Sequence, residues 1–180
     1  MDKSIYEPQE DSYFLSKILE EHIPKLDKNL KNLKVLEIGC GSGIQLDSLI
    51  KIGILKKNVF AVDINSKAVN YCKLKGFNCK ISNLFENVKE KFDIIIFNPP
   101  YLPLDKNEPE ESRLATTGGI KGSEIINKFL KQAKNYLNKE GIIFILTSNL
   151  TKKVDFKPFK KTLLGQKALF YEKLFVWVLS

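Results

Sequence analysis

The apolar run Phe92-Asp93-Ile94-Ile95-Ile96-Phe97 is followed directly by Asn98-Pro99-Pro100-Tyr101. Five of its six residues are apolar, which is typical of a strand that a parallel sheet buries on both faces. Neither proline can donate a hydrogen bond to a neighbouring strand, so the strand has to end at Asn98. Ligands bind at the carboxyl ends of strands in open α/β sheets. The sequence therefore predicts an α/β fold with a binding site at this turn.

The residues of the turn suit the recognition of a planar NH2 group. The side-chain oxygen of Asn98 and the carbonyl of Pro99 can each accept one hydrogen, while the ring of Tyr101 lies against the plane of the group. Pro100 adds no competing N–H donor. Taken alone, the four residues would be interpreted more simply as a proline-stiffened turn, but their surroundings favour a binding role.

Composition points to an ordinary globular protein. A chain of 180 residues is most simply one domain, and we predict a single domain over residues 1–180. The apolar fraction of 43% is normal, and no apolar run approaches the roughly 18 residues of a membrane span. The chain begins Met1-Asp2-Lys3-Ser4 and has no signal-peptide core there, so the predicted location is cytoplasmic, with no membrane partner.

Charge and cysteine content bear on nucleic-acid partners and on metal sites. The net charge of +8 comes almost wholly from lysines spread along the chain, so nucleic acid is an open but not favoured partner. Cys40, Cys72 and Cys79 contain no CxxC pair, and His22 is the only histidine. We therefore predict no metal site, and three structural thiols.

Strands and helices alternate along the chain, which predicts a parallel sheet with helices on both faces and right-handed crossovers. A final pair of strands adds an antiparallel hairpin, for seven strands in all. The predicted strands are Val35–Ile38, Val59–Val62, Phe77–Ile81, Phe92–Phe97, Ile142–Leu146, Thr162–Phe170 and Leu174–Leu179. The predicted helices are Asp11–His22, Ile44–Ile52, Ser66–Lys75 with Ser66 as N-cap, and Ser123–Leu137; a long loop covers Leu102–Lys121.

The glycine-rich loop after the first strand, Gly39-Cys40-Gly41-Ser42-Gly43, lets the backbone approach a ligand closely. Asp63, at the end of the second strand, can accept both hydroxyls of a ribose. A dinucleotide motif would need glycine where Ile44 stands, and Glu37 would repel a pyrophosphate. Glu37 suits a cofactor that carries an ammonium and a sulfonium, so the sequence favours S-adenosyl-L-methionine.

These motifs together resemble the class I, Rossmann-like S-adenosylmethionine-dependent methyltransferases that act on planar nitrogen. Tyr6-Glu7-Pro8-Gln9-Glu10-Asp11-Ser12 is similar to the N-terminal signature of the HemK-type branch, which methylates the glutamine of the GGQ motif in peptide chain release factors. The short chain resembles the eukaryotic and archaeal members. The resemblance covers about Tyr6 to Leu146 well, and the last thirty residues only in outline.

The resemblance implies roles for individual residues. Residues 1–30 would form an N-terminal helical segment over the cofactor site, with Glu10, Asp11 and Ser12 in its wall. Glu37 and Gly39 would hold the methionine part and Asp63 the ribose, Asn83 and Leu84 would flank the adenine, and Gly41 and Ile64 would also bind the cofactor. Asn98 would touch the cofactor, and Asn98, Pro99, Pro100 and Tyr101 would form the catalytic segment. The family usually has aspartate where Asn83 stands, so we expect cofactor binding to be weaker or retuned but not lost.

Other functions stay open at this point. The same turn could hold the exocyclic amine of adenine or guanine in RNA or DNA. Protein lysine methylation and a non-catalytic cofactor-binding subunit are further alternatives. The resemblance also implies a small zinc-binding activator protein that pairs with the edge of the sheet, and an apolar strand at Phe77–Ile81 is the expected place.

Overall fold

The computed structural model describes residues 5–180, apart from the side chain of Glu111; the polar start of the chain at residues 1–4 lies outside the described residues. Seven strands of the described part form one sheet in the order β3-β2-β1-β4-β5-β7-β6. Five of them are parallel, and β7 runs antiparallel to both β5 and β6. The strands are β1 (Val35–Ile38), β2 (Val59–Asp63), β3 (Asn78–Ile81), β4 (Phe92–Phe97), β5 (Leu137–Ser148), β6 (Lys161–Ala168) and β7 (Lys173–Leu179). This arrangement confirms the predicted fold class.

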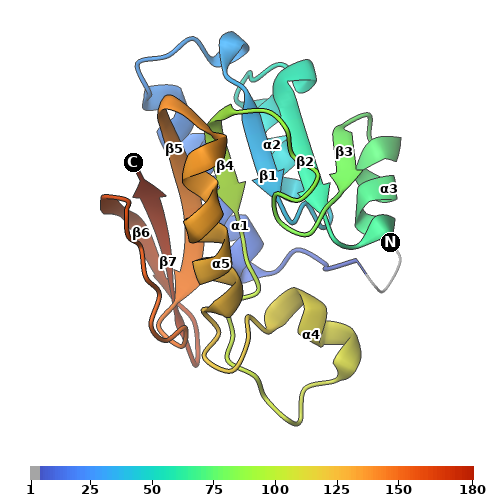
Figure 1. Ribbon diagram of the computed structural model, residues 1–180, viewed down its shortest axis with the longest axis vertical. Helices are drawn as coiled ribbons and strands as arrows, with labels where there is room; N and C mark the ends of the chain where they lie inside the picture. The colour runs from blue at the N-terminus through green and yellow to red at the C-terminus, as the bar shows by residue number, and fades with distance from the viewer. Residues whose placement is uncertain (1–4) are drawn as a thin grey trace.

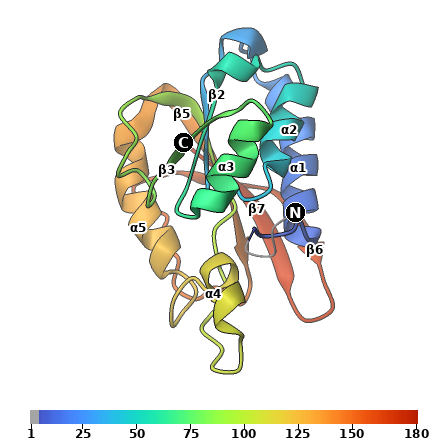
Figure 2. The same ribbon diagram turned by 90° about the vertical axis from the view of Figure 1, so that its right-hand side faces the viewer.

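Helices cover both faces of the sheet. Figure 2 shows α5 on one face, with α1 and α2 on the other. The α-helices are α1 (Glu10–His22), α2 (Ile44–Lys51), α3 (Ser66–Leu74), α4 (Glu110–Thr116) and α5 (Glu124–Ala133). Short 3-10 turns occur at Ile23–Lys25, Leu30–Asn32, Lys56–Asn58 and Lys134–Tyr136. Within residues 5–180, no helix combines the length and the apolar character needed to cross a membrane.

The helix α5 shows how the sequence pattern builds the core. Its residues Ile126, Phe129, Leu130 and Ala133 recur at helical spacing, and all four are buried. The Phe129 ring lies 4.7 Å from that of Phe97 at the end of β4, centroid to centroid. The helix therefore packs directly over β4, the strand that leads into the turn Asn98-Pro99-Pro100-Tyr101, which is called the acceptor turn below.

The sheet also fixes where a ligand can bind. From β1 the chain first adds β2 and β3 on one side, and then crosses to add β4 and β5 on the other. The strand order therefore reverses between the neighbours β1 and β4. Such a switch point leaves a crevice at the carboxyl ends of the strands. Figure 1 shows α4 beyond those ends, below the sheet.

Several predicted boundaries are wrong, although every predicted strand and helix exists. The predicted helix Ser123–Leu137 ends at Ala133, because Leu137 already pairs with Phe92 as the first residue of β5. The ladder then shifts register before Ile142, so β5 is longer than predicted. Phe77, the predicted first residue of the third strand, precedes β3. The first strand of the hairpin, β6, spans Lys161–Ala168 instead of the predicted Thr162–Phe170.

Two local features differ from the prediction for physical reasons. The N-cap of α3 is Asn65, not Ser66, because the Asn65 side-chain oxygen accepts a hydrogen bond from the Lys67 amide. The predicted loop Leu102–Lys121 contains α4, which begins after Pro109 at the acidic residue Glu110.

Candidate active site

A cavity of about 610 Å³ opens at the carboxyl ends of β1, β2, β3 and β4. Its volume lies within the roughly 300–1,000 Å³ that is usual for small-molecule and cofactor sites. The sequence-predicted residues that line it are Asp11, Ser12, Glu37, Gly39, Gly41, Asp63, Ile64, Asn83, Leu84, Asn98, Pro99 and Pro100. The structure therefore brings together residues from most of the chain in one hollow.

Glu37 lies in the middle of β1 and is only 2% exposed, because β2 and β4 flank the strand on both sides. Its Oε2 is buried and has no hydrogen-bond partner. Burial raises the pKa of Glu37 well above its usual value, and the nearby Cys72 and Asp63 raise it further. An unpaired carboxyl of this kind is the natural partner of a cationic group that enters the cavity.

Asp63 joins the end of β2 to the glycine-rich loop. Its Oδ2 accepts a hydrogen bond of 2.9 Å from the Gly41 amide, and its Oδ1 accepts one of 2.8 Å from the Asn65 amide. Burial raises the pKa of Asp63, and these two backbone donors counteract part of that increase. Each carboxylate oxygen has a second lone pair, so both can still accept from a diol.

Asn83 follows β3 at the rim of the cavity. Its Nδ2 donates a hydrogen bond of 2.8 Å to Oε1 of Glu86. Next to it, the backbone of Leu84 is held at a φ of 52°, and the Leu84 carbonyl accepts from the Ser82 hydroxyl at 2.9 Å. Because Glu86 binds the NH2 of Asn83, the amide oxygen is the part left to receive a donor.

Asn98 in the acceptor turn is also bound through its NH2 group by a carboxylate. Nδ2 of Asn98 donates a hydrogen bond of 3.0 Å to Oδ2 of Asp11, and Oδ1 of Asn98 is buried without a partner. Asp11 lies in the first turn of α1, and its Oδ1 accepts from the Ser12 amide at 2.6 Å and from the Tyr6 hydroxyl at 3.1 Å. Because Asn98 lines the cavity, its wall contains an oxygen acceptor that no protein donor uses.

Glycines of the segment that follows α4 press against the turn from behind. A Cβ on Gly118 would lie 2.5 Å from the Pro100 carbonyl oxygen, and one on Gly122 would lie 2.3 Å from that of Tyr101. The Tyr101 carbonyl also accepts a hydrogen bond of 2.9 Å from the Thr151 hydroxyl. No larger side chain fits at these two glycines, so the turn is held by backbone packing.

Two predicted site residues do not line the cavity. The carboxylate of Glu10 pairs with Lys167 on β6 instead of facing the cavity. Tyr101 is 8% exposed and lies behind the wall, where burial and then the charge of Asp11 raise the pKa of its hydroxyl. The ring expected to lie against the acceptor is thus part of the supporting layer.

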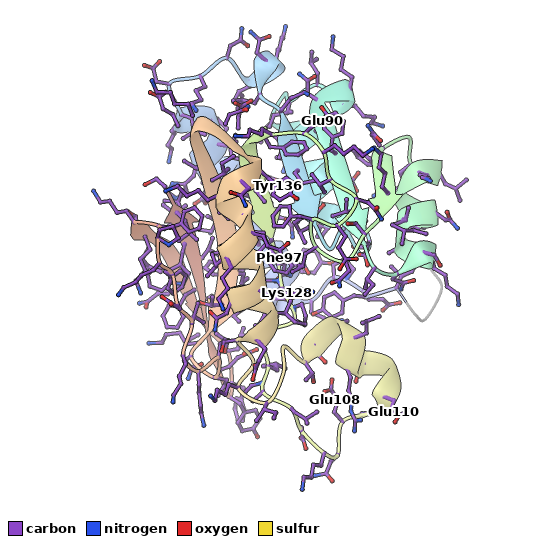
Figure 3. The ribbon with its side chains drawn as sticks, in the orientation of Figure 1. Glu90, Phe97, Glu108, Glu110, Lys128 and Tyr136 are labelled. Carbon is purple, nitrogen blue, oxygen red and sulfur yellow. The ribbon has the colours of Figure 1, made fainter. Side chains whose placement is uncertain are left out.

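Sequence reasoning missed a second group of lining residues. Some neighbour predicted ones, namely Ile38, Ile44, Asn65, Ser66, Lys67, Ala68, Ser82 and Phe97, and could have been found from their positions; Tyr6 and Gln45 complete the N-terminal side. Leu114 and Ala115 come from α4, and Ile125 and Lys128 come from α5. Figure 3 shows Lys128 on α5 in front of Phe97, with Glu108 and Glu110 on the α4 segment below. No local sequence signal marks the residues from α4 and α5.

The three cysteines meet behind the glycine-rich loop. All are buried, and their Sγ atoms lie within 4.8 Å of one another although they come from the loop, α3 and β3. Sγ of Cys72 also lies 3.6 Å from the Gly41 carbonyl oxygen. Nothing in the spacing of the cysteines along the chain indicates this cluster, which packs α3 and β3 against the loop.

Fold and cavity together define a class of enzyme. In the described residues, the buried side-chain acceptors without a partner are Glu37 Oε2 and Asn98 Oδ1, and both belong to residues of this cavity. Glu37 fits an ammonium, Asp63 fits a ribose diol, and the rim at Asn83 fits an amino-purine. The protein is a class I, Rossmann-like methyltransferase that uses S-adenosylmethionine as its methyl donor.

The chain belongs to the methyltransferase small domain family, whose model matches residues 14–166, and within it to the HemK-type protein N5-glutamine methyltransferases. It is 43% identical over 158 residues to a putative protein N5-glutamine methyltransferase of Methanocaldococcus jannaschii, covering 82% of this chain and 74% of the relative. It is 34% identical over 168 residues to the eRF1 methyltransferase catalytic subunit mtq2 of Schizosaccharomyces pombe, covering 80% and 72%.

Among solved structures, the chain is similar to one in the E. cuniculi Mtq2–Trm112 complex, which is described as responsible for methylation of the eRF1 translation termination factor. The TM-score is 0.75, with 23% identity and coverage of 98% of both chains. This similarity extends the shared fold over the last two strands, where the sequence resemblance was only an outline.

Proposed function

We propose that this protein methylates the side-chain amide nitrogen of a glutamine in a peptide chain release factor. The observation that carries the proposal is the buried, unpartnered Oδ1 of Asn98 at the cavity wall. A buried acceptor without a partner is destabilising by about 1–3 kcal/mol, and an NH2 donor from a substrate would remove that cost. The activities named for the relatives supply the identity of the acceptor.

The chain's own residues have distinct parts in this proposal. Glu37 and Gly39 bind the methionine part of the cofactor, Asp63 the ribose, and the oxygen of Asn83 the adenine amino group. When bound, S-adenosylmethionine supplies an electrophilic methyl group on its sulfonium. Asn98 and the Pro99 carbonyl orient the amide.

An amide nitrogen is a weak nucleophile, so orientation and charge stabilisation carry the catalysis. Oδ1 of Asn98 and the Pro99 carbonyl accept the two hydrogens of the NH2 group and hold its nitrogen toward the methyl donor. Both hydrogen bonds strengthen as positive charge develops on the nitrogen, which lowers the barrier more than it stabilises the ground state. The proton then leaves to water.

Mass spectrometry of a GGQ-containing release factor tests the proposal. The factor is incubated with the protein and S-adenosylmethionine, and the expected result is one added methyl group on the glutamine of that motif. A release factor with alanine in place of this glutamine should stay unmodified, and Asn98→Ala should abolish transfer while cofactor binding persists. An unmodified glutamine, with transfer to RNA, DNA or a lysine offered in parallel, would replace this function with one of the alternatives.

We further propose that a small activator subunit pairs with β3, which lies at one edge of the sheet. Ile81 on this strand is 51% exposed, and Leu74 at the end of the adjacent α3 is 89% exposed. An edge strand with apolar neighbours suits the addition of a partner's strand. Ile81→Lys should weaken co-purification with a candidate zinc-binding activator, whereas Leu163→Lys on the opposite edge strand should not. The predicted cytoplasmic location is consistent with a translation factor as substrate.

A further inference from the structure

We propose that Asp11 is a positioning residue that holds the Asn98 amide with its oxygen, and not its NH2, toward the substrate. The inference rests on the proposed transfer to an NH2 group. It concerns the same site but gives Asp11 a role toward the acceptor, where the sequence resemblance had placed it in the cofactor pocket.

The side chain of an asparagine has two orientations of nearly equal shape, and only one of them suits this chemistry. With Oδ1 at the cavity wall, Asn98 accepts a hydrogen from the substrate NH2 group. If the side-chain amide of Asn98 were rotated by a half-turn, its NH2 group would face the NH2 group of the substrate, and neither could accept a hydrogen bond. Asn98 is followed by two prolines, which have no N–H with which to orient the amide.

Asp11 can select between these orientations because a carboxylate only accepts hydrogen bonds. Its Oδ2 receives the 3.0 Å hydrogen bond from Nδ2 of Asn98. In the flipped orientation, that oxygen would instead face Oδ1 of Asn98, so a charge-assisted bond would be exchanged for the contact of two acceptors.

Asp11 is itself held in place. It is 5% exposed, and its Oδ1 accepts from the Ser12 amide at 2.6 Å, the Tyr6 hydroxyl at 3.1 Å and the Ser12 hydroxyl at 3.3 Å. These donors converge on Oδ1, whereas Oδ2 accepts from Asn98, and the Tyr101 hydroxyl also interacts with this carboxylate. The orientation of the acceptor residue is therefore transmitted from the first turn of α1 to the end of β4.

This arrangement makes an unusual prediction for Asp11→Asn. The Ser12 and Tyr6 donors would keep the new amide's oxygen where Oδ1 is now, so its NH2 would point at Asn98. Asn98 would then turn its own oxygen toward residue 11 and its NH2 toward the substrate. At saturating cofactor we expect kcat to fall about 10- to 100-fold, as when an orienting partner is lost beside a metal ligand.

Asp11→Ala is the matched variant, because it removes the same charge without supplying a donor. Asn98 would be free to adopt both orientations, and if these were equally populated kcat would fall only about twofold. The expected order is thus that the isosteric asparagine is more damaging than alanine. A purely structural role for Asp11 predicts the reverse order, since asparagine preserves the packing, and that result would overturn the proposal.

A binding measurement provides a readout independent of turnover. Peptides carrying the acceptor glutamine, or glutamate in its place, are titrated into the wild-type protein and the variants Asp11→Asn and Asp11→Ala. Each protein is first saturated with S-adenosylhomocysteine, the form of the cofactor that remains after methyl transfer. Relative to Asp11→Ala, we expect Asp11→Asn to shift the preference toward the glutamate peptide by about tenfold, because the exposed NH2 of Asn98 accepts a carboxylate. An equal preference in the two variants would contradict the inversion.

Glu20→Gln controls for loss of an acidic group on the same helix. Glu20 pairs with Lys51 on α2 and does not line the cavity, so kcat and peptide preference should match wild type. Failure of the proposed function is distinguishable, because it appears as wild-type protein that leaves glutamine unmodified. In that case the order of the two Asp11 variants is measured on the NH2 substrate that wild type does methylate.

Discussion

Oδ2 of Asp11 accepts a hydrogen bond of 3.0 Å from Nδ2 of Asn98, although the two residues are 87 positions apart in the chain. A similar pairing occurs at the other end of the cavity, where Asn83 donates its NH2 to Glu86 at 2.8 Å. In both cases a carboxylate binds the NH2 of an asparagine and leaves the oxygen free to accept. In the function proposed above, the oxygen of Asn83 would receive the amino group of the adenine and that of Asn98 the NH2 group of the substrate.

Replacing Glu37 should separate stability from function. Glu37→Gln removes the cost of an acidic group buried without a partner, so we expect the free energy of unfolding of the cofactor-free protein at neutral pH to rise by roughly 1–3 kcal/mol. The same change should weaken S-adenosylmethionine binding by at least about tenfold, since the partner of the ammonium is lost. Chemical denaturation and calorimetry measure the two effects. A variant that is less stable without cofactor would contradict the burial argument.

The raised pKa of Glu37 also predicts how stability depends on pH. The folded protein holds this proton more tightly than the unfolded chain, whose glutamate has the usual value of 4.5. The free energy of unfolding should therefore fall as the pH rises above 4.5 and through the raised pKa, and Glu37→Gln should lack this part of the slope. Denaturation curves at a series of pH values, run on both proteins, show whether the two slopes differ.

The same proton should be released when the cofactor binds. An ammonium favours the ionised form of Glu37, so affinity should increase with pH over that window. Calorimetric titrations in two buffers with different ionisation enthalpies would report the released proton as a difference in apparent heat. Equal heats for wild type and Glu37→Gln in both buffers would show that Glu37 is not its source.

Gly122→Ala should damage methyl transfer more than cofactor binding. Gly122 has a φ of +79°, and an added Cβ would lie 2.3 Å from the Tyr101 carbonyl oxygen, so the acceptor turn has to move. We expect kcat to fall at least about tenfold, as small misplacements of reacting groups have large effects. Gly53→Ala is the control, because Gly53 has a φ of +99° but nothing within 4 Å of its Cβ position. It should lose only about 1 kcal/mol of stability.

Restoring the family's aspartate at position 83 should not help by itself. In Asn83→Asp, the donor to Glu86 is lost and two carboxylates come together, so we expect little gain in cofactor affinity. Asn83→Asp combined with Glu86→Gln reverses the hydrogen bond, because a glutamine at position 86 can donate to the new carboxylate, and should bind cofactor several-fold more tightly than either single variant. Isothermal titration of the four proteins gives the coupling directly; additive effects would mean that Glu86 does not orient residue 83.

Local patterns in the sequence are sufficient to predict where the strands that lead into the cofactor site end. β1 ends at Ile38, before the glycine-rich loop, and β4 ends at Phe97, before Asn98 and two prolines that cannot donate ladder hydrogen bonds. By contrast, the predicted helix ran on to Leu137 because its residues continue an apolar pattern. Pairing of Leu137 with Phe92 is a tertiary contact that local pattern cannot contain.

The missed parts of the site have the same origin. Leu114 and Lys128 reach the cavity from α4 and α5, whose placement depends on the packing of the whole sheet. Nothing in the spacing of Cys40, Cys72 and Cys79 indicates that β3 and α3 bring their thiols together. Asp11 was predicted for the site, but its partner could not be known, because a hydrogen bond between the first helix and the fourth strand exists only in the folded chain.

The clearance behind the acceptor turn bears on how such proteins diversify. Because Gly118 and Gly122 leave no room for even a methyl group, mutation can hardly reshape the turn without disabling it. Leu114 on α4 also lines the cavity but is 60% exposed, so we expect it to tolerate many side chains. Related proteins that acquire new acceptors should therefore differ first in α4 and last in Asn98, Pro99, Pro100 and Tyr101.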